Sequence, residues 1–88
     1  MKLVNIGYGN MINSSRIVAV VSPDAAPIKR LVQGTRAAGK LIDASSGKKT
    51  RSVLVADSGH LVLSALTAET VLRRINGADT QEEQDEDE

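Results

Sequence analysis

The chain of 88 residues has no cysteine, tryptophan or phenylalanine, one histidine and one tyrosine. Without cysteine there are no disulfides and no thiolate metal ligands, and one histidine is too few for a histidine zinc site. Tyr8 alone cannot form the row of aromatic side chains on which proteins stack single-stranded bases. The core must therefore be aliphatic, and any recognition chemistry must come from charged, amide and hydroxyl groups.

Long apolar runs are also missing. No run approaches the roughly 20 residues that cross a bilayer, and residues 1–7 lack the apolar stretch of a signal peptide. We therefore expect a cytoplasmic protein without a membrane partner. The length suits one domain, expected over residues 1–78, and a domain this short is only marginally stable alone.

The formal net charge of zero conceals a strong asymmetry. Residues 79–88 contain seven acidic residues and no basic one, which leaves 11 basic against 4 acidic residues, a net charge of +7, in residues 1–78. A basic domain favours a polyanionic partner such as nucleic acid. The acidic segment is poor in apolar residues, so we predict a disordered tail at 79–88.

Alternating apolar residues and turn residues predict the order β-(β)-β-α-β-β-β-α, a small α+β fold with one mostly antiparallel sheet. Residues 57–60 should form a hairpin turn. Ser22 or Asp24 could cap the first helix, and Thr67 the second. The expected strands cover residues 2–6, 11–13, 16–22, 41–44, 51–56 and 61–66, and the expected helices 24–38 and 68–76.

Three of these strands, at 16–22, 51–56 and 61–66, carry apolar residues on both faces. We expect the two short helices to cover one face only. The other face would then be an exposed apolar surface, which favours contact with another subunit. The sequence therefore predicts a homo-oligomer.

Candidates for catalysis are weak. A nucleophilic triad needs a base beside the nucleophile, and the only histidine, His60, lies in a predicted turn, where a solvated ring is the favoured interpretation. Asp43 and Asp57 border strands and could share a metal or an acid–base role, although such residues more often cap loops or pair with cations. We therefore predict no enzyme, no catalytic residue, no metal site and no cofactor.

The segment at 47–50 (GKKT) is similar to the end of a nucleotide-binding P-loop. That motif needs a glycine where this chain has Ile42, and it is followed by a helix rather than a strand. We therefore reject a nucleotide site. A glycine-containing loop with two lysines can nevertheless bind an anion through backbone amides and side chains.

The predicted DNA-binding residues are Lys48, Lys49 and Arg51 around this loop, and Arg16 at the start of a strand. Antiparallel strands can bring strand ends and loop tips to one edge, so we expect Arg16 near the loop. With neither a helix-turn-helix nor a zinc finger, a duplex would be held by its backbone and read through its shape. Auxiliary phosphate contacts are expected from polar residues beside these cations, namely Asn13, Ser14, Ser15 and Thr50.

Several blocks of the sequence, in order over residues 1–75, resemble the RemA family of extracellular-matrix regulators. The blocks are residues 5–10 (NIGYGN), 16–23 (RIVAVVSP), 26–30 (APIKR), 41–44 (LIDA), 47–51 (GKKTR) and 60–65 (HLVLSA). The resemblance implies a nucleoid-associated protein that binds duplex DNA selectively and activates biofilm matrix genes. It also implies a ring-shaped homo-oligomer with a basic rim that holds the DNA.

The family's DNA-contacting arginines correspond to Arg16 and to Lys48, Lys49 and Arg51. The family pattern has arginines where this chain has the two lysines, and an aromatic residue where it has Ser46. Lysine binds phosphate but lacks the two-pronged guanidinium that reads guanine. The alternative interpretation is a non-catalytic structural or adaptor oligomer that binds a protein or an anionic ligand with the same loop.

Overall fold

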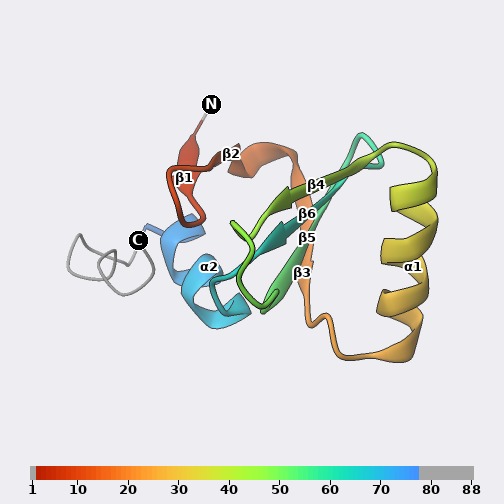
Figure 1. Ribbon diagram of the computed structural model, residues 1–88. Coiled ribbons are helices and arrows are strands. Elements are labelled where there is room, and N and C mark those ends of the chain that lie inside the picture. The colour runs from red at the N-terminus through yellow and green to blue at the C-terminus, as the bar shows by residue number, and fades with distance from the viewer. Residues whose placement is uncertain (1, 78–88) are drawn as a thin grey trace.

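The computed structural model describes residues 2–77, so the predicted tail at 79–88 lies outside the described residues. The predicted order of strands and helices is confirmed, with most boundaries shifted by one or two residues (Figure 1). The elements are β1 (Leu3–Asn5), β2 (Met11–Asn13), the 3-10 helix η1 (Ser14–Arg16), β3 (Ile17–Val21), α1 (Ala26–Ala37), β4 (Leu41–Ala44), β5 (Ser52–Ala56), β6 (Leu61–Ser64) and α2 (Ala68–Ile75).

The prediction of mostly antiparallel strand pairing is confirmed, because β1–β2, β3–β5 and β5–β6 are all antiparallel. The prediction of one sheet is wrong: β1 and β2 form a separate two-stranded ribbon, because η1 interrupts the chain between β2 and β3. In the four-stranded sheet of order β3-β5-β6-β4, the exception to the antiparallel pairing is β4, which lies parallel to β6. The loop at residues 45–51 carries the chain from β4 past β6 to β5, which leaves β4 on the outer side of β6.

The two helices lie on opposite faces of the four-stranded sheet, so the prediction that both cover one face is wrong. Side chains alternate along a strand, and Val53 and Leu54 of β5 therefore point to opposite sides. Leu54 packs in a cluster with Val71 of α2, whereas Val53 belongs to a second cluster that Ile28 and Val32 of α1 join.

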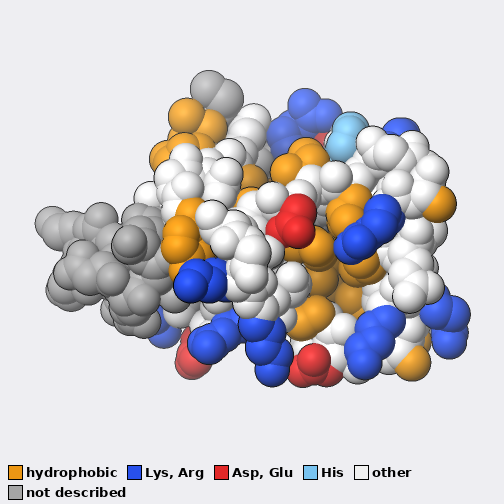
Figure 2. Space-filling view, in the orientation of Figure 1, with side chains coloured by type: hydrophobic (Ala, Val, Ile, Leu, Met, Phe, Trp, Pro, Cys, Tyr) orange, Lys and Arg blue, Asp and Glu red, His pale blue; other side chains and the backbone are white. Residues whose placement is uncertain are grey.

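The cover that α1 provides is nevertheless incomplete. No residue of α1 is buried, whereas Val71 of α2 is fully buried. A cleft of 620 Å³ remains between α1 and the sheet. Figure 2 shows apolar side chains in the hollow between the helix and the strands. The apolar surface that the sequence predicts is therefore present as a cleft rather than as a bare sheet face.

The start of α1 also differs from its prediction. The helix begins at Ala26 after Ala25, which makes no side-chain capping bond. Ser22 does not cap the helix; its Oγ accepts a hydrogen bond from the Asp24 amide at 3.2 Å. The predicted cap of α2 is confirmed, because Thr67 Oγ1 accepts from the Thr70 amide.

A buried serine joins the ribbon to the sheet and ends β6 two residues earlier than predicted. Ser64 Oγ donates to Ile6 O at 2.9 Å and accepts from the Leu66 amide at 3.0 Å. These bonds turn the chain away from the sheet toward α2. Within residues 2–77, neither helix has the length and apolar character needed to cross a membrane.

Candidate nucleic-acid interface

The loop between β4 and β5 is a braced tight turn. Ser46 and Gly47 have positive φ angles of 57° and 78°, and the Lys48 amide donates to Ser45 O at 2.9 Å, the pattern of a type I′ turn. Below it, Asp43 Oδ1 accepts from the Ser45 hydroxyl at 2.6 Å and from the Ser45 amide at 2.9 Å. These hydrogen bonds stabilise the carboxylate and lower the pKa of Asp43.

Three exposed cations extend from this loop: Lys48, Lys49 and Arg51. Among residues 2–77, no side chain forms a hydrogen bond or ion pair with any of the three. The Arg51 amide donates to Ser64 O at 2.8 Å, which fixes the backbone where β5 begins. The Lys48 amide is used within the turn, so this backbone donor is not available to an anion, and the lysine side chains are the principal donors of the loop.

Arg16 is held by a carboxylate. Its Nε donates to both oxygens of Asp57, at 2.8 and 3.0 Å, and the Asp57 amide donates to Arg16 O. Both side chains are largely exposed, so the ion pair adds little stability. The pairing uses Nε, and among residues 2–77 the two terminal nitrogens of Arg16 stay available for a further acceptor.

The structure does not bring Arg16 and the basic loop together within one subunit. Because β3 and β5 are antiparallel, Ile17 lies opposite Ala56, and Arg16 is at the far end of β5 from Arg51. The six steps from Arg51 to Asp57 span about 20 Å at roughly 3.3 Å per residue. The expectation that Arg16 would lie near the loop is therefore wrong for a single chain.

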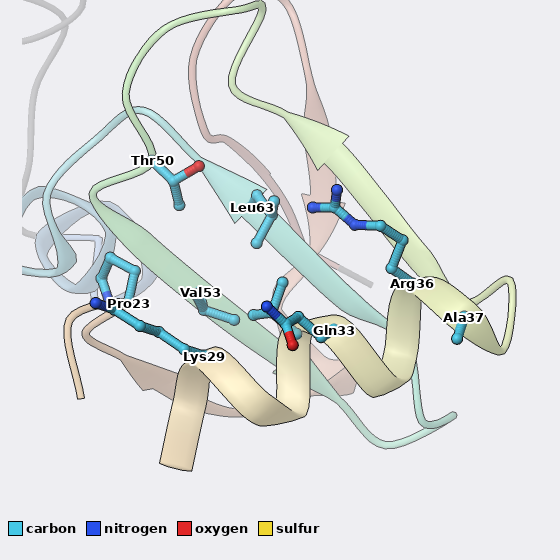
Figure 3. A pocket seen from close by; sticks show the side chains of 9 residues that line it. Pro23, Lys29, Gln33, Arg36, Ala37, Thr50, Val53 and Leu63 are labelled. Carbon is cyan, nitrogen blue, oxygen red and sulfur yellow. The ribbon is translucent and has the colours of Figure 1, made fainter. Parts of the chain in front are cut away.

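The predicted auxiliary residues are engaged mainly within the chain. Asn13 Oδ1 accepts from the Ser15 amide and hydroxyl, and the Ser14 amide and hydroxyl donate to Lys2 O. These bonds shape η1 and position Arg16. Thr50 is half-buried and lines the cleft beneath α1 (Figure 3).

Comparison with known proteins settles the family. The family described as extracellular matrix regulatory protein A-like, or RemA-like, matches residues 3–75. The chain belongs to the RemA-like family. It is 63% identical over 83 residues to a "Putative regulatory protein" of Dictyoglomus thermophilum, with 94% of this chain and 98% of the relative covered. A relative of the same description in Geobacillus kaustophilus is 53% identical over 79 residues, covering 90% and 91% of the two chains. The chain is thus a member of a family of regulatory proteins.

Two basic residues of α2 were not among the DNA-binding residues predicted from the sequence. Arg73 and Arg74 lie in the last turn of α2, and Figure 2 shows Lys and Arg side chains gathered along the edge formed by α2 and the neighbouring loop. The Ser52 hydroxyl donates to Leu66 O, which ties the start of α2 to the start of β5. The sequence gives no sign of a binding role for these two arginines, because cations in the last turn of a helix stabilise its C-terminus through the helix dipole.

The three side chains considered for catalysis, Asp43, Asp57 and His60, have structural partners. Asp57 pairs with Arg16 and Asp43 with Ser45, which confirms the interpretation that they pair with cations and brace loops. His60 Nδ1 lies 2.8 Å from Ser58 Oγ in the hairpin turn. Within residues 2–77, no three histidine or carboxylate side chains gather closely enough to hold a metal ion.

Proposed function

We propose that this RemA-like chain is a transcriptional regulator that binds duplex DNA through the basic loops of a homo-oligomer and controls extracellular matrix genes. The observation that carries the proposal is the set of three exposed cations, Lys48, Lys49 and Arg51, on and beside a braced turn, whose side chains have no partner among residues 2–77. The family description and the net charge of +7 over residues 1–78 point in the same direction.

In this proposal the lysines act on the DNA backbone. Lys48 and Lys49 each neutralise a phosphate, and Arg51 adds a guanidinium at the base of the loop. Arg16, oriented by Asp57, supplies a separate contact through its terminal nitrogens. One subunit offers few contacts, and repetition in an oligomer raises the affinity because bound loops increase the effective concentration of their neighbours.

A salt titration tests DNA binding directly. We expect log K for a duplex to fall linearly with log salt concentration, by about 0.9 for each phosphate neutralised, with several phosphates per bound oligomer. A mobility-shift assay at stepped salt concentrations measures this slope, with a duplex of unrelated sequence as the control for specificity. No duplex binding even at low salt would contradict the proposal and favour the adaptor alternative.

The acidic segment at 79–88 supplies a second test. Truncation after Ala78 should tighten DNA binding at low salt, because seven carboxylates repel DNA and compete for the cations of the loop. The difference should vanish at high salt, where exposed charges are screened. A chain of full length with the seven acids replaced by their amides is the matched control and should behave like the truncation. Equal affinities for all three forms at low salt would mean that the tail does not regulate binding.

A further inference from the structure

The cleft beneath α1 is apolar where it is deepest. Val53 and Leu63 of the sheet form its floor, and Val32 and Ala37 line it from the helix (Figure 3). Its opening carries polar side chains of α1, namely Lys29, Gln33 and Arg36. Contact between water and such aliphatic walls is unfavourable, so the cleft favours an occupant with an apolar tip and polar flanks.

A surface of that kind lies at the opposite end of the molecule, on the β1–β2 ribbon. Val4 pairs with Ile12 on the inner side of the ribbon, so Leu3 and Met11 point outward, where they are 53% and 51% exposed. The cross-strand register places these two side chains diagonally on one face, within reach of each other. Asn5 and Asn13 share that face. Figure 1 shows the ribbon and α1 on opposite sides of the molecule.

We propose that the cleft beneath α1 receives the β1–β2 ribbon of a second copy of this chain, with Leu3 and Met11 inserted against Val53 and Leu63. The amide side chains of the ribbon then face the polar opening of the cleft. This inference rests on the oligomer in the proposed function and names the surfaces that build it. Since the two surfaces differ, the contact is head-to-tail, and a ring forms if successive rotations close.

The contact also explains how the separated cations could form one site. Thr50 lines the cleft, next to Lys49 of the basic loop. Arg16 follows Met11 by only five residues along the chain. A ribbon docked in the cleft therefore brings Arg16 of one copy toward Lys48 and Lys49 of the next. The DNA-binding site in this arrangement is shared between neighbours.

Complementation between two variants tests the contact. Met11→Glu damages the ribbon but leaves the cleft, and Ala37→Arg blocks the cleft but leaves the ribbon; both sites are exposed, so both variants should fold. By light scattering, we expect the wild type to assemble, each variant alone to be monomeric, and an equimolar mixture to give dimers only. One intact ribbon and one intact cleft remain in the mixture, so growth stops at two copies.

The matched control is Val18→Glu, a 66% exposed position on β3 outside both surfaces, which should assemble like the wild type. Circular dichroism verifies that each variant is folded. The contact is refuted by a monomeric wild type, by a mixture without dimers, or by an Ala37→Arg variant that still forms dimers alone. Loss of assembly in Val18→Glu alone would instead identify the sheet edge as the interface.

A fluorescent dye tests whether the cleft is filled by the ribbon of a second copy or is open to a small ligand. DNA binding of the same variants is measured in a separate assay. The apolar anion 8-anilinonaphthalene-1-sulfonate should fluoresce with the Met11→Glu monomer, whose cleft is open, and not with the assembled wild type. Equal fluorescence with both would overturn the proposal. An oligomer built by these surfaces that fails to bind DNA would refute the regulator proposal alone, whereas a DNA-binding oligomer that both Met11→Glu and Ala37→Arg still form would refute only this contact.

Discussion

Replacement of Lys48 and Lys49 together by alanine is expected to abolish DNA binding and to leave assembly and the melting temperature nearly unchanged. Both side chains are exposed and have no partner within residues 2–77, so their removal breaks no internal contact. Surface substitutions of this kind usually change stability by less than about 0.5 kcal/mol. A mobility-shift titration should show no complex at concentrations that saturate the parent, while light scattering gives the same mass.

The matched control removes two cations from other places. Arg30→Ala with Lys40→Ala lowers the net charge equally, from exposed positions on α1 and just before β4, and should weaken binding far less. Lys49→Arg should preserve or strengthen DNA binding, because a guanidinium can bond a phosphate with two nitrogens.

The outcome that contradicts the site concerns the double alanine variant. If the chain with Lys48 and Lys49 both replaced by alanine bound DNA like the parent, the loop would be only a solvated turn.

Leu54→Ala is expected to cost about 2–5 kcal/mol of unfolding free energy, the usual range for a large-to-small change in a core. Leu54 is fully buried and packs with Ile6 and Val71, so its removal leaves a cavity between the sheet and α2. For a domain of this size each 1 kcal/mol lowers the melting temperature by about 4–8 °C. Thermal unfolding must be compared at one protein concentration, because assembly adds stability that depends on concentration.

Leu31→Ala is the control for that loss. It makes the same chemical change in α1, where the side chain is 45% exposed, and should cost well under about 1 kcal/mol. Similar losses in the two variants would contradict the core described here. A large loss at Leu31 alone would mean that the outer side of α1, rather than Leu54, carries the principal packing.

The sequence predicts best those features whose chemistry is local. The hairpin at residues 57–60 and the Thr67 cap each depend on a few neighbouring residues, and both occur as expected. The exposed cations of the β4–β5 loop are equally local, since a glycine-containing turn between two strands places its lysines in solvent. The residue types at the candidate site were therefore predictable.

Arrangement in space was less predictable. Apolar residues on both sides of β5 show that both faces need cover, but they do not show which helix covers which face. The parallel pairing of β4 with β6 depends on where the loop at 45–51 leads the chain, and no local pattern encodes that path. The distance between Arg16 and Arg51 follows from strand register, so the two ends of the site could not be located from composition and spacing.

The strand order of the four-stranded sheet has a consequence for synthesis on the ribosome. Both outer strands of the sheet, β3 and β4, precede the β5–β6 hairpin with which they pair. The hairpin is the most local contact of the sheet and is therefore the natural first step of its folding. Until its partner strand β5 is complete, the nascent segment Ile17–Val21 stays unpaired, for the time needed to add the 35 residues from Val21 to Ala56. At about 5–20 residues per second this is about 2–7 s. Of the four strands in this sheet, the uncharged and mostly β-branched β3 therefore stays unpaired longest. On crowded polysomes it has the most time to pair with the same segment of a neighbouring nascent chain.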